Sequence, residues 1–470
     1  MNVFDVRKGL VEDYRKYVQS FVEVADERIG EKVRMHFAEG ELWPEPLLQL
    51  NPSFEAGRSV DDLVDEGVLH SLCRPIFRGG KGKDDTKGRT MRLHRHQEDA
   101  IRIARTGASY VLTTGTGSGK SLAYIIPIVD HVIRTGTGKG VQAIVVYPMN
   151  ALANSQVGEL QKFVSPAGGD GVVSFKRYTG QESGEEKDKL LDNPPDILLT
   201  NYVMLELILT RWKDRRLIEN SKALSFLVLD ELHTYRGRQG ADVAMLVRRV
   251  REAFGVSDLR CVGTSATMAG PGTLAEQKVE VSKVASRLFG TVIEAANVIG
   301  ETLRRSTIKP DYEDGATLAI LVDSIRNYAA PAALQAYYDH PLSAWIETAF
   351  GLELETASGL FKRKKPRAIG GDNGAAKELS ELSGMLEERC NEVIRLHLLA
   401  GYQLEDPAKN NQPPFAFRIH QFLSRGDSVY ATIESKEERY ITLRGQRFVP
   451  SDRTRLLYLR VPSSSWKTVP

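Results

Sequence analysis

Several features that would place a protein in a specialised class are scarce in this sequence. Only three cysteines, Cys73, Cys261 and Cys390, occur among 470 residues, and their wide separation argues against a disulfide framework and a zinc site. We interpret them as buried thiols in a reducing cytoplasm. No window approaches the roughly 18 consecutive apolar residues of a membrane-spanning helix. The N-terminal MNVFDVRKGLVEDYRK also lacks the apolar core of a signal peptide. We therefore expect a cytoplasmic protein without a membrane partner.

A surplus of charge of one sign is missing as well. Lys and Arg number 63 against 61 for Asp and Glu, which gives a net charge of only +2. The overall charge therefore does not indicate a nucleic-acid partner, and any such contact must come from local patches. With 41% hydrophobic and 26% charged residues, the composition is typical of a soluble globular protein. The length predicts two or three domains.

The central part of the chain alternates short β-branched runs with helical stretches. The runs are SYVLTT (109–114), AIVVY (143–147), SFKRYT (174–179), DILLT (196–200), FLVLD (226–230) and RCVGTS (260–265). Apolar strands alternating with helices predict an α/β fold in which helices cover both faces of a parallel sheet. Ligands of such sheets bind at the carboxyl ends of the strands.

The regions on either side of this central part differ from it in composition and residue pattern. Apolar residues at helical spacing in 4–38 predict a long or broken amphipathic helix. Three prolines in 43–54 indicate an extended, turn-rich connector, and the polar, glycine-rich 78–89 is typical of a mobile linker. The basic run 362–374 is expected to be a surface loop.

These differences in composition and residue spacing predict four segments. They are an N-terminal helical extension and linker (1–90), a sheet domain (91–295), a mostly helical accessory region (296–410) and a β-rich segment (411–470). The expected fold is thus an α/β domain with an N-terminal helical extension and a C-terminal mixed α+β region.

A glycine-rich stretch, SYVLTTGTGSGKS (109–121), joins a predicted strand to a predicted helix. The N–H groups of such a turn and the N-terminus of the next helix converge on an anion, so the pattern predicts a phosphate-binding loop. Lys120 is expected to contact the β- and γ-phosphates and Ser121 to bind magnesium. Thr114 replaces the first glycine of the strict pattern, at a position that only opens the turn. The predicted nucleotide-binding residues here are Thr114, Gly115, Thr116, Gly117, Ser118, Gly119, Lys120 and Ser121.

Two adjacent acids end another predicted strand, in LVLDELHTYRGRQG (227–240). Paired carboxylates at the end of a buried strand are costly unless a cation lies nearby. Because the carboxyl ends of parallel strands share one edge, we expect Asp230 to lie near Lys120. Asp230 and Ser121 are the predicted ligands of Mg²⁺, which prefers oxygen atoms. Glu231 is predicted to polarise or orient an attacking water. The predicted cofactors are therefore ATP and Mg²⁺.

The combination of TGTGSGKS and DELH resembles the first motor domain of the superfamily 2 DExH-box helicases. Further segments follow in that family's order: LHRHQEDAI (93–101), VVYPMNALANSQ (145–156), TNYVML (200–205) and GTSATM (263–268). The resemblance implies a RecA-like fold and an ATP hydrolase that acts on nucleic acid. DELHTYRGRQGADVAMLVRRV is moreover similar to the MrfA/YprA-type DNA-repair helicases and to the helicases of the DISARM and Druantia anti-phage systems. That similarity implies DNA with a single-stranded region as the partner, in repair or phage defence.

The resemblance also implies roles for individual residues. Gln97 would read the edge of the adenine. Lys120, Asp230, Glu231 and His233 would form the catalytic set, with His233 relaying between the nucleotide and the GTSATM segment. The coupling residues of that segment would be Ser265, Ala266 and Thr267.

The same resemblance implies that five positions contact the nucleic-acid backbone: Asn150, Ala151, Asn154, Thr200 and Asn201. Backbone N–H groups and short polar side chains can hold phosphates without reading bases. The alternative role of these side chains is helix capping. Arg236 and Arg238 follow the acid pair and either reach nucleic acid or brace Glu231, whereas Tyr235 is expected in the core.

One expected motif is missing from residues 271–470. The Gln-x-x-Gly-Arg-x-Gly-Arg pattern, whose arginines a second RecA-like domain supplies in this superfamily, does not occur there. Such arginines contribute roughly 10³–10⁵ in rate. We expect the N-terminal part of a longer or split helicase that needs a second RecA-like domain in cis or in trans and hydrolyses ATP slowly alone. Two alternatives stay open: a nucleic-acid-binding subunit that uses ATP as a conformational latch, and an RNA helicase.

Overall fold

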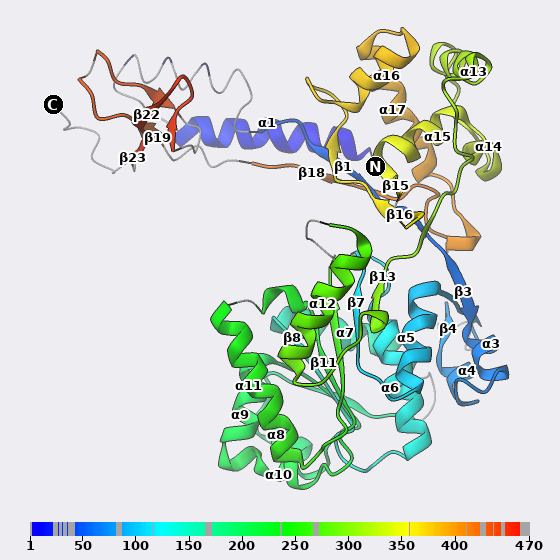
Figure 1. Cartoon of the computed structure of the whole chain (residues 1–470), viewed down its shortest axis with the longest axis vertical. Coiled ribbons are helices and arrows are strands. Elements are labelled where there is room, and N and C mark those ends of the chain that lie inside the picture. Colours follow the sequence, from blue (N-terminus) through cyan, green and yellow to red (C-terminus); the bar gives the residue numbers. More distant parts are fainter. Residues whose placement is uncertain are drawn as a thin grey trace. The chain divides into compact units, whose positions relative to one another are not determined.

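The computed structural model describes residues 2–21, 27, 31, 35, 43–80, 87–115, 117–164, 172–235, 237–266, 272–356, 358–409, 411–423, 429–435, 437–442 and 447–460 (Figure 1). Two compact units are present and are described separately. The sheet unit comprises Phe54–Arg304 and Leu354–Lys362, and the helical unit comprises Met1–Ser53, Arg305–Glu353 and Arg363–Pro470. The four predicted segments stay a prediction, although the sheet unit begins well before residue 91.

A seven-stranded sheet forms the centre of the sheet unit (Figure 1). In spatial order its strands are β13 (Val298–Gly300), β7 (Tyr110–Thr113), β12 (Arg260–Ser265), β11 (Phe226–Leu229), β8 (Ala143–Tyr147), β10 (Ile197–Asn201) and β9 (Phe175–Tyr178). Every neighbouring pair is parallel. All seven carboxyl ends therefore lie along one edge of the sheet.

Each face of this sheet packs on its own group of helices, because successive strand residues point to opposite faces. Tyr110 and Leu112 of β7 belong to one buried cluster, whereas Val111 between them belongs to the other. The first face is covered by α5 (Arg95–Arg105), α6 (Leu122–Thr135) and α7 (Asn150–Val164). The second is covered by α8 (Gly184–Asp192), α9 (Tyr202–Thr210), α10 (Arg215–Glu219), α11 (Gly237–Phe254) and α12 (Leu274–Phe289).

The predicted α/β class and all six predicted strands are confirmed. The one strand of this sheet that the sequence did not predict is β13, which has only three residues and no alternating pattern. It pairs with β7 at the edge of the sheet, from Val298 opposite Val111 to Gly300 opposite Thr113. Tertiary pairing with an existing strand, rather than local propensity, therefore defines it.

Short elements precede α5 in the sheet unit. They are β3 (Ala56–Ser59), α3 (Val60–Asp65), α4 (Cys73–Ile76), β4 (Arg78–Gly79), β5 (Arg89–Thr90) and β6 (Arg92–His94). The region predicted as a mobile linker thus has strands at both ends, since β4 and β5 pair in antiparallel fashion. Residues 81–86 between them lie outside the described residues.

The helical unit is built around one buried cluster that includes Tyr337, Trp345 and Phe350. Its helices are α1 (Val3–Phe21), α13 (Gly315–Arg326), α14 (Leu334–Tyr338), α15 (Pro341–Ile346), α16 (Ala375–Ser383) and α17 (Glu387–Tyr402), with a π-helical turn at Glu347–Gly351. Its strands are β1 (Leu47–Leu50), β17 (Arg367–Ala368), β18 (Phe417–His420), β19 (Val429–Ala431), β20 (Ile441–Thr442), β21 (Phe448–Val449), β22 (Asp452–Leu456) and β23 (Tyr458–Arg460). Among the described residues, no helix combines the length and apolar character needed to cross a lipid bilayer.

Two predictions for this unit are corrected. The region 43–54 is not only a connector, because β1 is the central strand of a small antiparallel sheet between β17 and β18. The run 362–374 is not a loop throughout, because Arg367 and Ala368 form β17. In both places pairing with a distant segment overrides the turn-forming composition. Of the predicted helix 4–38, the part beyond Phe21 lies almost entirely outside the described residues.

Four short strands lie where the chain passes between the two units: β2 (Ser53–Phe54), β14 (Leu303–Arg304), β15 (Leu352–Glu355) and β16 (Leu360–Arg363). Three-residue 3₁₀ turns occupy Trp212–Asp214, Leu232–Thr234, Ala295–Asn297 and Pro407–Lys409.

The turn between α6 and β8 depends on two glycines in the left-handed region. Gly138 and Gly140 both have φ +76°. A Cβ on Gly140 would lie 2.1 Å from the carbonyl oxygen of Asn220, whereas a Cβ on Gly138 would meet no heavy atom within 4 Å. The two positions share the same backbone strain and differ in the space available.

We predict that Gly140→Ala destabilises the chain far more than Gly138→Ala. The left-handed conformation costs a non-glycine residue roughly 1–2 kcal/mol at either site, and overpacking against backbone adds about 1–3 kcal/mol at Gly140 only. Thermal unfolding followed by circular dichroism compares the two variants with the wild-type chain. Equal midpoints for both variants would contradict the close approach of Gly140 to Asn220.

Candidate functional site

The predicted phosphate loop lies between β7 and α6, at the carboxyl edge of the sheet. Gly117 and Gly119 have φ +84° and +71°, a conformation that side chains rarely adopt. A Cβ on Gly119 would lie 2.5 Å from Nε2 of Gln97, so glycine is needed there for space as well. The Thr114 and Ser118 hydroxyls lie 2.7 Å apart beneath the loop. Thr116 lies outside the described residues.

Helix α5 holds this loop from behind. The side chain of Gln97 donates to the carbonyl oxygen of Gly119 (2.9 Å), and Nε2 of His96 lies 2.9 Å from the carbonyl oxygen of Ser118. The carbonyl oxygen of Gln97's side chain accepts from the backbone N–H of His94 (2.8 Å) and completes the N-terminal cap of α5. Both the NH₂ group and the carbonyl oxygen of the Gln97 side chain are therefore engaged, and the residue is only 3% exposed. In this arrangement the Gln97 side chain faces the loop, and its contact with adenine stays a prediction.

The opening of the loop is held from the other side by β13. The backbone N–H of Gly115 donates to the carboxylate of Glu301, the residue that follows β13. The hydroxyl of Thr113 donates to the carbonyl oxygen of Ile299 (3.1 Å). Sequence reasoning missed Glu301 because it follows a strand too short to be recognised. A partly buried acid that lies 186 positions from Gly115 along the chain carries no local signal.

The acid pair meets the loop at the same edge of the sheet. Nζ of Lys120 lies 3.2 Å from Oε1 of Glu231, with both side chains largely buried. Glu231 has φ +55° and ψ +55°, a left-handed conformation that is rare for a residue with a Cβ. Its backbone N–H donates to the hydroxyl of Thr264 (3.2 Å) and the same hydroxyl donates to the carboxylate of Asp230. Strands β7, β11 and β12 thus bring a cation and two acids together.

Asp230 is partly buried at the end of β11. Burial is the main cause that raises its pKa above the ordinary value, and the charge of Glu231 adds to this effect. The hydrogen bond from Thr264 and the charge of Lys120 act in the opposite direction. A carboxylate under these conditions is stabilised by a cation placed beside it. The electrostatics therefore favour a cation next to Asp230.

His233 lies beside the acid pair in the 3₁₀ turn after β11. Its Nδ1 is 3.3 Å from the hydroxyl of Ser265 and 3.2 Å from Oε2 of Glu231. Oε2 of Glu231 is buried and accepts no hydrogen bond among the described residues. His233 and Ser265 are thus in contact, and their coupling role stays a prediction. Ala266 follows directly after β12, and Thr267 lies outside the described residues.

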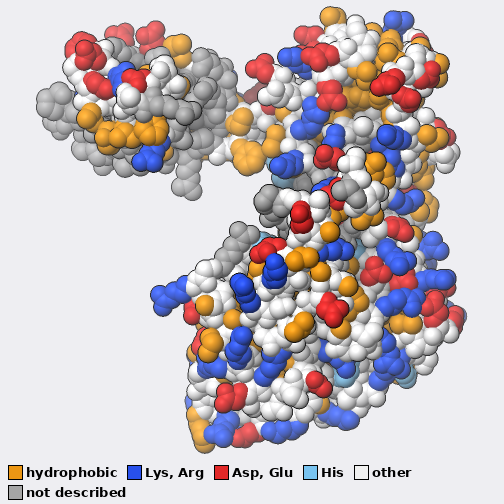
Figure 2. All heavy atoms as spheres, in the orientation of Figure 1, with side chains coloured by type: hydrophobic (Ala, Val, Ile, Leu, Met, Phe, Trp, Pro, Cys, Tyr) orange, Lys and Arg blue, Asp and Glu red, His pale blue; other side chains and the backbone are white. Residues whose placement is uncertain are grey.

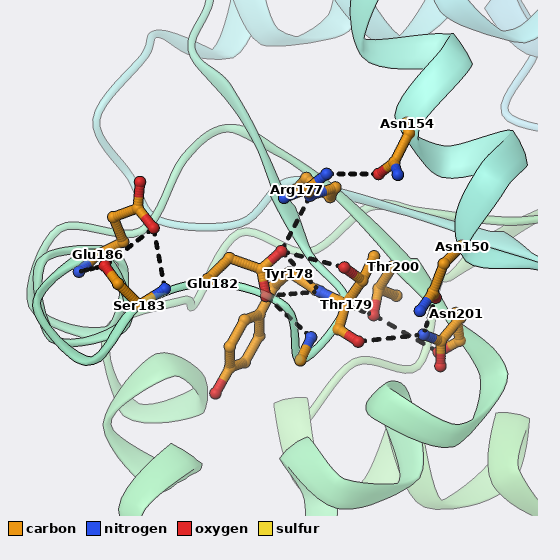
Figure 3. A network of polar contacts seen from close by, with 11 residues as sticks. Asn150, Asn154, Arg177, Tyr178, Thr179, Glu182, Ser183, Glu186, Thr200 and Asn201 are labelled. Atoms are coloured by element: carbon orange, nitrogen blue, oxygen red, sulfur yellow. Dashed lines mark hydrogen bonds and ion pairs between the residues drawn. The ribbon is translucent and has the colours of Figure 1, made fainter.

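A second polar cluster lies at the ends of β9, β10 and the start of α7 (Figure 3). The Asn201 side chain donates to Oδ1 of Asn150 (2.5 Å) and accepts from the backbone N–H of Met204 (2.7 Å). Asn201 therefore caps α9, which is the alternative role considered for these residues. Thr200 is fully buried and its hydroxyl donates to the carbonyl oxygen of Tyr178 (2.7 Å), at odds with a direct phosphate contact through that hydroxyl.

Arg177 of β9 is a member of this cluster that sequence reasoning missed. Its Nε donates to Oε1 of Glu182 (3.0 Å), and its Nη1 donates to Oδ1 of Asn154 (Figure 3). Glu182 also accepts from the backbone N–H groups of Thr179 and Gly180. The only available signal was an arginine in a predicted strand next to the expected nucleic-acid path. Ala151 is exposed beside Asn150, and Arg238 is exposed at the start of α11, whereas Arg236 lies outside the described residues.

The surface of the sheet unit has mixed charge. On the face shown in Figure 2, basic and acidic side chains are interspersed, in keeping with a net charge of +2. Among the residues that the structure describes, no group of three or more His, Cys, Asp and Glu side chains is placed to hold a metal ion. The three cysteines are buried and unpaired, as predicted, and Tyr235 is part of the core.

Comparison with known proteins gives the class to which this site belongs. Residues 94–274 match the model of the DEAD/DEAH box helicase family. The resemblance predicted from the sequence is confirmed.

Named relatives add detail. The chain is 32% identical over 235 residues to the uncharacterized ATP-dependent helicase YprA of Bacillus subtilis. That match covers 49% of this chain and 28% of YprA. It is 23% identical over 381 residues to the Druantia protein DruE of Escherichia coli. That match covers 57% of this chain and 20% of DruE. The chain therefore spans between a fifth and a third of the length of these relatives.

The structural comparison also finds the DUF1998 helicase MrfA, solved bound to DNA and AMPPNP, whose sequence is 26% identical to this chain over the matched part. The match covers 55% of this chain and 33% of MrfA, with a TM-score of 0.41.

We predict that acid weakens the sheet unit through the two histidines behind the phosphate loop. Burial lowers the pKa of both His94 and His96 to about 4, against about 6.5 in an unfolded chain. The folded state therefore binds fewer protons, and stability falls as the pH drops from about 6.5 towards 4. For His96 alone the loss between pH 7 and pH 5 is on the order of 2 kcal/mol.

Thermal unfolding of the wild-type chain and of His96→Gln between pH 7.5 and pH 5 tests this prediction. The variant should have the flatter pH profile, because glutamine does not titrate. His420→Gln, in the helical unit, controls for the loss of a histidine as such. An identical slope for the wild-type and His96→Gln chains would contradict the assignment.

Proposed function

We propose that this chain binds Mg²⁺–ATP at the edge of its central sheet and serves as the first motor domain of an ATP-dependent DNA helicase or translocase. The observation that carries the proposal is the 3.2 Å approach of Lys120 Nζ to Glu231 Oε1, which joins a glycine-rich loop to an acid-tipped strand. The DEAD/DEAH box domain and relatives named as ATP-dependent helicases support the same function.

The donor set at this edge fits a metal–triphosphate. Carboxylate and hydroxyl oxygens are the ligands that Mg²⁺ prefers, and Asp230 and Ser121 would hold the ion. The orphaned Oε2 atom of Glu231 leaves an acceptor available for a water molecule. Bound Mg²⁺ supplies neutralisation of the phosphate charge. Lys120 binds the β- and γ-phosphates, and Glu231 orients and deprotonates the attacking water once Lys120 has turned to the phosphates.

The remaining site residues act around this centre. The loop backbone from Thr114 to Ser121 wraps the phosphates, and His233 with Ser265, Ala266 and Thr267 links the nucleotide to the nucleic acid. Gln97 reaches adenine only after releasing Gly119, so we assign it first to holding the loop. Arginines that stabilise the transferring phosphoryl would come from a second RecA-like domain, in cis or in trans. Without them the chain should hydrolyse ATP slowly.

We infer that the nucleic acid lies across the ends of β8, β9 and β10. Asn150, Ala151, Asn154 and Asn201 lie there, with Thr200 contributing its backbone rather than its buried hydroxyl. Arg177 adds the cation that the sequence-based set lacks. Its guanidinium is oriented by Glu182, and Nη2 has no partner among the described residues. A preoriented guanidinium with a free N–H group is well suited to a phosphate.

The substrate we favour is DNA with a single-stranded region, in repair or phage defence. The similarity to YprA and to the Druantia protein DruE supports this choice. An RNA helicase is the second candidate, because the chain is also 32% identical over 135 residues to the ATP-dependent RNA helicase mak5 of Schizosaccharomyces pombe. Competition between single-stranded DNA and RNA of the same sequence for the purified chain distinguishes the two.

We predict that Lys120→Ala weakens binding of a fluorescent, non-hydrolysable ATP analogue at least tenfold, since the variant loses the phosphate-facing charge (about 1.4 kcal/mol or more). Glu231→Gln should retain binding, because it leaves the proposed metal ligands in place and frees Lys120 from its ion pair. The titrations are done with Mg²⁺ and with EDTA.

Lys283→Ala on α12 is the matched control, because Lys283 is an exposed lysine that pairs only weakly with Glu280 (4.0 Å). Equal affinities of wild-type, Lys120→Ala and Glu231→Gln chains would exclude the proposed nucleotide site.

We predict that Arg177→Ala weakens binding to single-stranded DNA and lowers the slope of log K against log salt concentration by about 0.7, the share of one phosphate contact. Fluorescence anisotropy with oligo-dT at several salt concentrations measures both quantities. Arg177→Lys should recover part of the slope because it keeps the charge but not the planar guanidinium.

Arg216→Ala serves as the control. Arg216 forms ion pairs with Asp188 and Asp192 on the helices of the second face, away from the proposed path. If Arg177→Ala and Arg216→Ala shift the salt slope equally, Arg177 does not contact the strand.

A further inference from the structure

The acid pair at the end of β11 lies on a strained turn. Glu231 has φ +55° and ψ +55°, and among the described residues only Asn411 also combines a side chain with a positive φ. The left-handed conformation costs a residue with a Cβ roughly 1–2 kcal/mol. Such a conformation persists only where the surrounding structure fixes it, and it is common at functional sites. The residues that fix the turn at Glu231 are therefore candidates for a role in the site.

Thr264 of the neighbouring strand β12 fixes the turn through its hydroxyl. Leu229 lies opposite Gly263 in the parallel pair of β11 and β12, so the next residue of β12 lies beside the acids. The Thr264 hydroxyl accepts from the N–H of Glu231 (3.2 Å) and donates to the carboxylate of Asp230. Thr264 is fully buried, where hydrogen bonds are electrostatically stronger than in water. One hydroxyl group thus holds both acids.

Gly263 supports the same turn by leaving space for it. A Cβ at this position would lie 2.9 Å from Cγ of Leu232 and closer still to its Cδ1. Leu232 directly follows Glu231 and begins the 3₁₀ turn after the acids. A methyl group on Gly263 would push this side chain aside. Two consecutive residues of β12 therefore act on two consecutive residues of the turn, one by hydrogen bonding and the other by its small size.

We propose that Thr264 is a positioning residue whose hydroxyl fixes the carboxylate of Asp230, the proposed magnesium ligand, and the backbone of Glu231, which would orient the attacking water. Gly263 assists by leaving room for the turn. The inference rests on the proposed function and adds the residues that set the geometry of its acid pair. Both residues precede the three coupling residues that the family resemblance implies, and neither takes part in the contact between His233 and β12.

The magnesium dependence of nucleotide binding tests the role of the hydroxyl. A fluorescent, non-hydrolysable ATP analogue is titrated at a series of Mg²⁺ concentrations and in EDTA. Thr264→Val keeps the shape of the side chain and loses the hydroxyl. Because groups that orient a metal ligand typically contribute about 10–100-fold, the half-saturating Mg²⁺ concentration should rise about tenfold or more, whereas affinity in EDTA should stay within about twofold of wild type. Thr264→Ser keeps the hydroxyl and should restore the wild-type Mg²⁺ dependence.

Amide hydrogen exchange of the ligand-free chain gives a second readout, which needs neither nucleotide nor metal. The N–H of Glu231 is protected while it is hydrogen-bonded, so a peptide spanning 227–235 should exchange faster in Thr264→Val than in the wild-type chain. In Thr264→Ser it should exchange as in wild type. A peptide spanning 143–147 should exchange at the wild-type rate in both variants, because only a general loss of stability would speed exchange there.

Thr432→Val in the helical unit is the matched control. It removes another buried threonine hydroxyl, one that accepts from the backbone N–H of Tyr440 (2.9 Å). The variant should leave both the Mg²⁺ dependence and the exchange of the peptide spanning 227–235 unchanged.

A pair of size changes tests the part assigned to Gly263. Gly263→Ala should also raise the half-saturating Mg²⁺ concentration, because the added methyl group meets Leu232. Adding Leu232→Ala removes the atoms in its way and should reverse part of that rise. A Gly263→Ala chain with the wild-type Mg²⁺ dependence would overturn the assignment of Gly263.

The remaining outcomes separate this inference from the proposed function. A wild-type chain whose analogue binding does not depend on Mg²⁺ overturns the proposed metal site and this inference with it. A wild-type chain that depends on Mg²⁺, with a Thr264→Val variant of the same dependence, overturns the inference alone. An equal loss in Thr264→Ser or in Thr432→Val also overturns it, because the effect would then not follow the hydroxyl at position 264.

Discussion

The arrangement of this site depends on the burial of two carboxylates at the end of one strand. Asp230 and Glu231 follow β11, where the sheet removes water from both side chains and burial raises the pKa of Asp230. An uncompensated charge pair there would destabilise the fold. Lys120, from the glycine-rich loop after β7, supplies the compensation at 3.2 Å. Because the strands are parallel, the loop and the acids must share an edge. Burial raises the free energy of the charged carboxylates, so a cation placed beside them is favoured.

The phosphate loop is itself a supported structure rather than a free turn. Helix α5 supplies His96 and Gln97 to the carbonyl oxygens of Ser118 and Gly119, and Glu301 accepts from the N–H group of Gly115. A glycine-rich backbone loses much conformational entropy when it is ordered. Fixing it from both sides in advance lowers the cost of binding an anion. The same contacts place the side chain of Gln97 against the loop.

The edge that we propose for nucleic-acid binding is organised by contacts between side chains that the sequence presents as separate motifs. Asn150 and Asn201 bond to each other, and Arg177 joins Asn154 to Glu182. These contacts orient the side-chain N–H donors and give each of them a hydrogen-bond acceptor within the protein. A bound phosphate would replace some of them, so the cluster is both preorganised and exchangeable. Helix capping by Asn201 and strand binding are therefore compatible roles of one side chain.

The sequence by itself determined the α/β class, six strands of the central sheet, the glycine-rich loop and the acid pair. All are local patterns: β-branched runs, glycines at fixed spacing, and charge at the end of an apolar stretch. Only the tertiary structure decided which distant residues contact these local patterns. Strand β13, the support from Glu301, the engagement of Gln97, the burial of Thr200 and the hydrogen bonds of Thr264 to the acid pair join residues far apart along the chain. Local propensity reports a segment's own backbone preference, whereas the partner of a buried polar group is set only when distant segments exclude water together.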